Sequence, residues 1–141
     1  MTGAPPAGET DLARLLATTR VSVAPETYVF ATTTEQVNIA ALAPRMVFEE
    51  AEGTTLVVAE EVARRHRLPA TFPSRMLTLD VHSALAAVGY MAAISRVLAD
   101  AGIPSNPVAG YFHDHLFIPL DRMDDAVRVI EALAASAPSS D

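Results

Sequence analysis

The most reactive side chains of this sequence gather in one short segment, His113-Asp114-His115. In an extended strand His113 and His115 project to the same face, where two imidazoles and a carboxylate could bind zinc or nickel, with His82 as a third nitrogen ligand. Structural zinc sites usually show four clear ligands, which this sequence does not offer. A metal site using His113 and His115 therefore stays an alternative, and we favour a turn that fixes a hairpin or lines a ligand pocket.

A catalytic interpretation would use Ser83 as nucleophile, with His113 and Asp114 as a base and its orienting carboxylate. Nothing in the spacing specifies this arrangement, and the Gly-x-Ser-x-Gly elbow of hydrolases is missing. The chain has neither cysteine nor lysine, which excludes thiolate and Schiff-base chemistry. We therefore predict that the protein is not an enzyme and needs no cofactor.

Composition limits the partners as well. Of 141 residues, 50% are hydrophobic and 19% are charged, a balance that favours a packed core. The net charge is -7 and the arginines are scattered, so we expect no nucleic-acid partner. No apolar run approaches the roughly 20 residues of a membrane span, and no export signal is recognisable. We expect no membrane association and a cytoplasmic location.

The second half of the sequence has the clearest periodicity. Residues 75–81 alternate between an apolar face (Leu77, Leu79, Val81) and a mixed one, which is typical of a strand. Apolar and small residues then recur at helical spacing over 85–101, and Gly102 is well placed to end that helix. Two strands, 108–112 and 115–118, and a helix over 122–135 capped by Asp121 complete the predicted order of strand, helix, strand, strand, helix. This order is most of the ferredoxin-like βαββαβ plan.

The first half has a related but less regular pattern. Thr10 or Asp11 can cap a short helix, residues 27–34 read as a strand, 46–50 and 54–59 read as a hairpin, and 60–67 reads as a helix. Residues 68–74, with two prolines, are interpreted as an internal boundary or a linker between the halves. We predict an α+β fold of two modules, 10–70 and 71–136, between flexible tails 1–9 and 137–141. If the strand over 75–81 is shared between the halves, two similar modules can be completed side by side.

The segment Asp80 to Ile103, DVHSALAAVGYMAAISRVLADAGI, resembles the signature of the ACT domain. The matching positions are Leu85, Val88, Leu98 and Gly102-Ile103. His82 and Ser83 stand where the signature usually has Pro and Gly. The stretches HSALAAVG, AGYFHDHLFIP and YVFATTT further resemble a group of stand-alone bacterial proteins with two ACT-like modules.

This resemblance implies a pair of ferredoxin-like modules with antiparallel sheets and helices on one face. ACT modules generally bind small molecules, most often free amino acids, and many pair edge to edge. The loop 81–85 matches the ligand-contacting loop of the family, and 106–110 matches the strand that lies opposite it. The predicted ligand-binding residues are His82, Ser83, Ala84, Leu85, Asn106, Val108, Gly110, His113 and Asp114.

A physical argument supports the same loop. The first amides of a helix lack intrahelical partners and carry the positive end of the helix dipole, so they suit a carboxylate. If Ser83 caps the helix, then Ser83, Ala84 and Leu85 supply these amides. We therefore predict a non-catalytic regulatory protein that binds a free amino acid, and helices apolar over a wide arc favour a homodimer. A ligand-free structural or partner-binding module is a further alternative.

Overall fold

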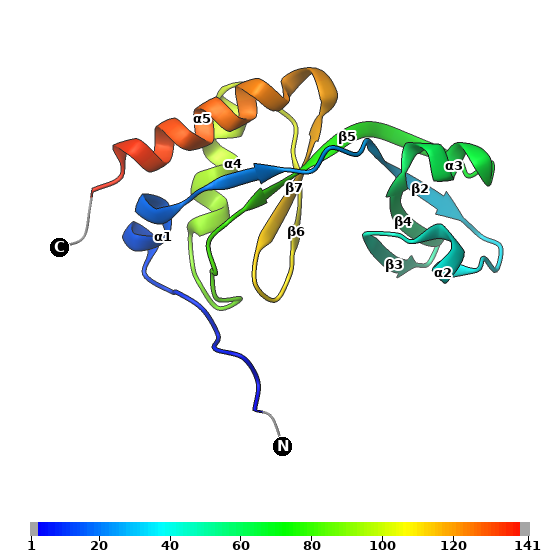
Figure 1. Cartoon of the computed structure of the whole chain (residues 1–141), viewed down its shortest axis with the longest axis horizontal. Helices are drawn as coiled ribbons and strands as arrows, with labels where there is room; N and C mark the ends of the chain where they lie inside the picture. The colour runs from blue at the N-terminus through cyan, green and yellow to red at the C-terminus, as the bar shows by residue number, and fades with distance from the viewer. Residues whose placement is uncertain (1–2, 139–141) are drawn as a thin grey trace.

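The computed structural model describes residues 3–138. Its strands form one seven-stranded antiparallel sheet in the order β3-β4-β2-β5-β7-β6, with β1 paired to part of β5 (Figure 1). In chain order the elements are α1 (Leu12–Thr18), β1 (Val21–Val23), β2 (Tyr28–Thr33), α2 (Ile39–Leu42), β3 (Met46–Glu50), β4 (Gly53–Ala59), α3 (Glu60–Arg65), β5 (Ala70–Leu79), α4 (Tyr90–Asp100), β6 (Asn106–Ala109), β7 (Asp114–Pro119), the 3-10 turn η1 (Leu120–Arg122) and α5 (Met123–Ser136).

Strand β5 joins the two halves of the sheet. Its first residues pair with β2 and its later ones pair with β7, so the strand runs across the whole molecule in Figure 1. Residues 68–74 do not form a linker, because residues from Ala70 onward belong to this strand, and the boundary between modules in this stretch stays a prediction. Phe72 has a left-handed φ of 62° and lies where the pairing with β2 shifts register, which makes room for Pro73. A bulge of this kind lets a strand bend and tolerate a proline that cannot donate a ladder hydrogen bond.

Each half of the sheet follows the ferredoxin-like plan. The elements β2, α2, β3, β4, α3 and the first part of β5 make one complete βαββαβ unit, with strands in the order β5-β2-β4-β3. The elements β5, α4, β6, β7 and α5 make the second, and β1 supplies its fourth strand beside β5. Helix α1 contacts α5 and α4, so Leu12–Val23 packs on the second half. The division at residues 10–70 and 71–136 stays a prediction.

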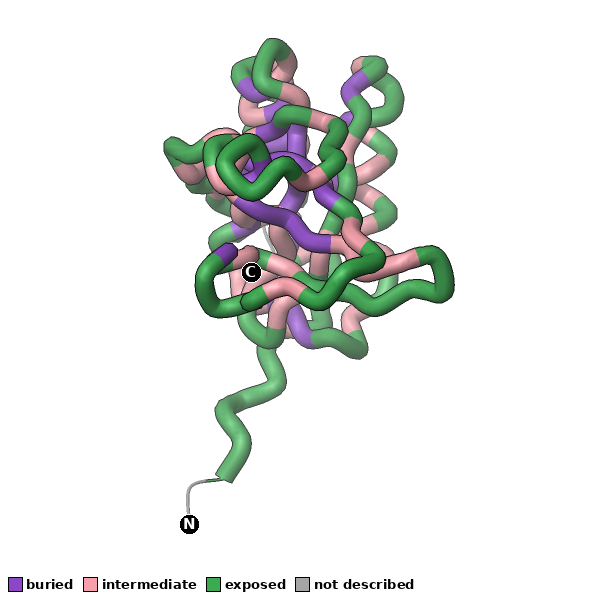
Figure 2. Tube along the Cα trace, turned by 90° about the vertical axis from the view of Figure 1, so that its right-hand side faces the viewer, coloured by how far each residue is buried: buried purple, intermediate pink, exposed green. Residues whose placement is uncertain are grey.

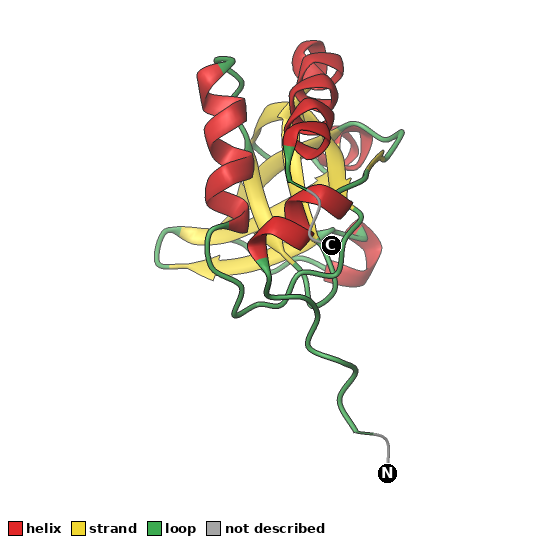
Figure 3. Cartoon of the chain, turned by 90° about the vertical axis from the view of Figure 1, so that its left-hand side faces the viewer, coloured by secondary structure: helices red, strands yellow, loops and turns green. Residues whose placement is uncertain are grey.

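In each half the helices pack on one face of the sheet. Figure 3 views the molecule from the side of α1, α4 and α5, with the strands behind them. In the second half, Leu77 and Leu79 from β5 and Leu116 and Ile118 from β7 bury the apolar sides of α1, α4 and α5. In the first half, Val29, Ala31, Leu56 and Val58 from the strands pack against Leu42 of α2 and Ala63 of α3. The two-residue alternation read from residues 75–81 therefore placed the core face of β5 correctly.

The opposite face of the sheet carries an aromatic cluster that spans β5. Phe117 from β7 packs edge to face against Tyr28 and Phe30 from β2, with ring centroids 5.9 and 5.5 Å apart. Val57 and Met76 complete this buried group. Figure 2 shows that the buried segments lie toward the middle of the molecule. The two halves therefore share hydrophobic packing as well as a strand.

Several local predictions hold and two do not. Asp11 caps α1 by accepting from the amide of Arg14 at 3.0 Å, and the hairpin turns at Gly53. Asp121 does not cap the last helix, because it lies inside η1 and α5 begins at Met123. The helix predicted over 85–101 begins only at Tyr90, and its cap residue is Gly89, with a left-handed φ of 95°. Leu85 and Val88 lie outside the helix, 69% and 84% exposed.

Candidate functional site

A pocket of about 290 Å³ lies beside the loop that leads from β5 to α4. The start of α4 forms one side, and β6 with the first residue of β7 forms the other. Its lining residues are Ser83, Ala84, Leu85, Ala87, Tyr90, Met91, Pro107, Ala109 and Asp114. We call this space the β5–α4 pocket.

The structure brings four of the predicted site residues to this pocket: Ser83, Ala84, Leu85 and Asp114. The other five lie elsewhere. The ring of His82 packs near Tyr111 and Phe112, and Nδ1 of His113 lies 3.3 Å from the carbonyl of Val81. Asn106, Val108 and Gly110 also miss the pocket, which takes the alternate residues Pro107 and Ala109 instead.

The parity of β6 explains this difference. Residues 106, 108 and 110 share one side of an extended strand and residues 107 and 109 share the other. Val108 packs with the aromatic cluster on the helix-free face, so its neighbours Pro107 and Ala109 turn toward the helix side. The sequence showed that a strand lies here, but a tetrapeptide with proline carries no alternation that would choose its face. Ala87, Tyr90 and Met91 were missed because the helix was expected to begin earlier.

Ser83 has a different role from the one predicted. It does not cap α4, and its hydroxyl donates to Oδ2 of Asp114 at 2.9 Å. The amide of Ser83 donates to the carbonyl of Val81, and the amide of Ala84 donates to the carbonyl of Glu9, so neither amide is free for a ligand. Because the loop at residues 83–84 pairs with Glu9, these residues do not join the helix. Helix α4 begins later, after its cap residue Gly89.

The pocket has two chemically distinct ends. Asp114 is half buried, and the hydrogen bond from Ser83 occupies only one of its oxygens, so the carboxylate keeps acceptor capacity. Helix α4 begins beside the pocket with no side-chain cap, and its first amides lack intrahelical partners. Tyr90 and Met91, the first residues of α4, line the pocket. A carboxylate at one end and the positive end of a helix dipole at the other complement a small zwitterion.

Tyr90 anchors this end of the helix to the N-terminal helix. Thr19 Oγ1 donates to the carbonyl of Leu15 at 2.6 Å, so the Tyr90 hydroxyl donates to Thr19 Oγ1 at 2.7 Å. Burial of the ring raises the pKa of Tyr90 to about 12 from its ordinary value of 10.0. The neutral phenol is therefore favoured in the folded protein.

This shift predicts a stability change in alkali. Between about pH 10 and 12 the unfolded chain ionises Tyr90 while the folded chain retains its proton, so stability falls as pH rises. The loss reaches roughly 2–3 kcal/mol, since one pKa unit corresponds to about 1.4 kcal/mol. Urea unfolding at pH 9 and pH 11.5 measures it. Tyr90→Phe should remove this part of the pH dependence, and an unchanged slope in that variant would contradict the assignment.

The two histidines of the predicted metal alternative are engaged in hydrogen bonds. His115 Nδ1 lies 2.9 Å from Thr78 Oγ1, and His113 faces the Val81 carbonyl. Burial is the main cause that lowers the pKa of His115 below 6.5, which favours the neutral ring. Among residues 3–138 there is no cluster of three or more His, Asp or Glu side chains placed to hold a metal ion.

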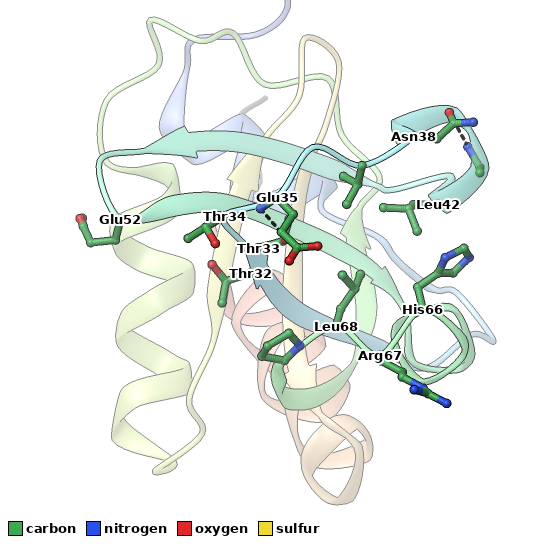
Figure 4. A pocket seen from close by; sticks show the side chains of 13 residues that line it. Thr32, Thr33, Thr34, Glu35, Asn38, Leu42, Glu52, His66, Arg67 and Leu68 are labelled. Carbon is green, nitrogen blue, oxygen red and sulfur yellow. Dashed lines mark hydrogen bonds between the residues drawn. The ribbon is translucent and has the colours of Figure 1, made fainter.

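A second, larger pocket of about 550 Å³ lies in the first half (Figure 4). The end of β2 brings Thr32 into it, Thr34 follows that strand, and the turn between β3 and β4 brings Glu52. Leu42 from α2 and Leu68 before β5 add apolar surface. The remaining lining residues are Thr33, Glu35, Val37, Asn38, Ala41, His66, Arg67 and Pro69.

Comparison with known families assigns both halves to the same kind of domain. One family model described as ACT domain matches residues 7–75, and another described as ACT domain matches residues 71–132. The chain belongs to the ACT-domain family. The two matches overlap over residues 71–75, which lie in β5, the strand that both ACT modules use. ACT domains are regulatory, non-catalytic modules, and this supports a regulatory ligand-binding role.

Solved structures share this fold. A crystal structure of a Vibrio cholerae protein, described as of unknown function and a possible transport protein, is 35% identical, with a TM-score of 0.80, and the match covers 87% of this chain and 95% of that one. An Agrobacterium tumefaciens protein is 13% identical with a TM-score of 0.66, covering 82% and 89% of the two chains.

The regulatory subunit of aspartate kinase from Thermus thermophilus, in a ligand-free form, is 12% identical with a TM-score of 0.57, covering 84% of this chain and 98% of that one. At that identity the likeness shows the fold alone. No curated protein matches the sequence. Within residues 3–138 no helix combines the length and the apolar character needed to cross a bilayer, and the cytoplasmic location stays a prediction.

The two pockets occupy corresponding places in the two ACT modules. Each lies where the first strand of its module leads into the first helix, β2 into α2 and β5 into α4. Each is also bordered by the hairpin between the second and third strands of the module, at Glu52 in one and at Ala109 and Asp114 in the other. The resemblance in sequence pointed only to the second of these places.

Proposed function

We propose that this protein is a non-catalytic regulatory protein that binds a free amino acid in the β5–α4 pocket. The observation that carries the proposal is the pairing of the Asp114 carboxylate with the uncapped start of α4 across one small pocket. An α-ammonium group fits beside the carboxylate, and an α-carboxylate fits at the helix start. The volume of about 290 Å³ lies at the lower end of small-molecule pockets, roughly 300–1,000 Å³, which favours a compact ligand.

The contacts of Ser83 support a binding role over a catalytic one. A serine nucleophile needs a base within hydrogen-bonding distance, usually a histidine. Within residues 3–138 the Ser83 hydroxyl is hydrogen-bonded to the Asp114 carboxylate, and no imidazole is bonded to it. The His113 ring, the base of the catalytic alternative, faces the Val81 carbonyl instead.

A thermal-shift panel of free amino acids tests the proposal. A ligand present at 100 times its dissociation constant is expected to stabilise the protein by about 2.7 kcal/mol, because it binds only the folded state. For a chain of this length the melting temperature should rise by several degrees. If no amino acid raises it, the ligand-free alternative, a structural or partner-binding module, takes its place.

We also propose that the protein is a homodimer, joined at the edge strand β3. Val47 and Phe48 of this strand are both exposed, and Phe48, on the helix-free side, is 64% exposed. An edge strand presents unpaired backbone groups that a second strand can pair with. The other edge, β6, contains Pro107, which cannot donate such a bond. Light scattering after size exclusion measures the mass, and a monomer at micromolar concentration would contradict the dimer.

A further inference from the structure

The N-terminal segment Pro5–Glu9 lies along the wall of the β5–α4 pocket. Glu9 forms a parallel bridge with Ser83. The Glu9 amide donates to the His82 carbonyl, and the Ala84 amide donates to the Glu9 carbonyl, both at 2.8 Å. These two bonds fix the backbone on either side of Ser83, the residue whose hydroxyl reaches Asp114 in the pocket. The segment was expected to be a flexible tail, and its contacts tie it instead to the loop over 81–85.

Two further contacts extend this attachment. The hydroxyl of Tyr111, in the turn between β6 and β7, donates to the carbonyl of Pro5 at 2.8 Å. Gly8 has a φ of 96°, and a Cβ atom on it would lie 2.7 Å from the His82 carbonyl and 2.8 Å from Cδ2 of the His82 ring. Only glycine therefore fits at this point, both for its backbone angle and for its close approach.

The docked arrangement also contains an unfavourable feature. His82 Nε2 is buried and has no hydrogen-bond partner among the described residues. Its ring packs near Phe112, with centroids 5.2 Å apart, and Gly8 lies against the neighbouring Cδ2 atom. A buried polar atom without a partner costs free energy that water would recover. Release of the segment would open one side of this ring, so docking is opposed locally and can be reversible.

We infer that Pro5–Glu9 is a strap that controls the β5–α4 pocket, an inference that rests on the proposed function. When the strap is docked, its bonds to His82 and Ala84 hold the wall with Ser83 against Asp114. When it is released, the wall loses both bonds and the pocket is in its binding-competent form for a smaller fraction of the time. Apparent affinity falls in proportion to that fraction. The consecutive prolines 5 and 6 restrict the free segment to extended conformations, which lowers the entropy cost of docking.

The experiment compares Gly8→Ala with Gly3→Ala in the full chain. Both add one methyl group near the N-terminus, but Gly3 lies before the strap and a Cβ there meets nothing within 4 Å. Amide hydrogen exchange is read at Ala84, whose amide donates to the strap. Gly8→Ala should accelerate this exchange about tenfold, the effect of losing one or two backbone hydrogen bonds, whereas Gly3→Ala should match the wild type. Equal exchange rates at Ala84 in the wild type and in both variants would contradict the inference that Pro5–Glu9 acts as a strap.

Tyr111→Phe provides a second variant that leaves the backbone unchanged. It removes only the bond to Pro5, so exchange at Ala84 should rise by a smaller factor than in Gly8→Ala. No change at Ala84 in this variant, together with none in Gly8→Ala, would again count against the strap. An unchanged melting temperature in Tyr111→Phe shows that any effect is local.

The last part of the test measures the affinity for the amino acid that raises the melting temperature of the wild type in the thermal-shift panel. Gly8→Ala should bind it more weakly than Gly3→Ala, by the factor by which the competent fraction falls, which is about tenfold if the strap of the variant is docked in only one molecule in ten. Equal affinities of the two variants, despite faster exchange at Ala84 in Gly8→Ala, would contradict the inference that the strap controls the pocket. If no amino acid binds the wild type, the proposed function fails, and exchange at Ala84 alone then decides whether the strap holds this wall.

Discussion

Replacing Phe117 with alanine is expected to lower the free energy of unfolding by about 3–5 kcal/mol. The Phe117 side chain is buried on the helix-free face and packs edge to face against both Tyr28 and Phe30. Its removal leaves a cavity between β7 and β2, and it also removes two aromatic pairs worth roughly 0.5–1.5 kcal/mol each beyond the buried area. Urea unfolding followed by circular dichroism and by tyrosine fluorescence measures the loss.

Phe112→Ala is the matched control, because this ring is about half exposed. It should cost less than half as much as Phe117→Ala, since about half of its surface stays in water in the folded protein. The two probes should give coincident transitions in the wild type, because β5 belongs to both halves and a module cannot unfold without freeing that strand. A loss below about 1.5 kcal/mol for Phe117→Ala would show that the aromatic cluster does not join the halves.

Replacing Asp114 with asparagine is expected to weaken amino-acid binding about 10-fold to 100-fold. The substitution keeps the shape of the side chain and an oxygen that accepts from Ser83, but it removes the negative charge that we assign to the α-ammonium group. A hydrogen bond to a charged group contributes roughly 1.5–3 kcal/mol, and most of that contribution is lost with the charge. Isothermal calorimetry with the amino acid found in the thermal panel measures the change.

Asp121→Asn is the control for net charge. Asp121 carries the same charge, lies exposed in η1 and does not line the pocket. It should leave affinity within about twofold of the wild type, since charges separated by more than about 8 Å are largely screened at physiological salt. If both variants bind as the wild type does, the ammonium end of the ligand is not at Asp114.

Much of the fold was accessible from the sequence because its signals are local. Alternation over 75–81 identified the core face of β5, the Asp11 cap identified α1, and the glycine at position 53 identified the β3–β4 hairpin. The resemblance of Asp80 to Ile103 to the ACT signature led to the family that the domain matches show. Short elements such as α2 and β1 were not predicted, because three or four residues carry too little periodicity.

The loop of the candidate site was located by resemblance, but its arrangement was not predictable. Apolar spacing alone predicts a helix that begins near Ser83, and the amides of Ser83 and Ala84 would then be available to bind a ligand carboxylate. They are occupied because Glu9, more than 70 positions earlier, pairs with this loop. The contribution of Pro107 and Ala109 in place of Asn106 and Val108 depends on which face of β6 the aromatic cluster buries. Both outcomes are set by contacts between distant segments.

The sequence by itself determined most of the ferredoxin-like elements, the acidic and cysteine-free chemistry, and the loop on which a ligand-binding role rests. These follow from residue types and from periodicities of two and 3.6 residues, which act over one element at a time. Only the tertiary structure decided that β5 serves both modules, that β1 completes the second, and that Asp114 and the start of α4 line one pocket. The reason is that strand partners and buried faces are chosen by the hydrogen bonds and apolar area of the whole sheet, which no single segment encodes.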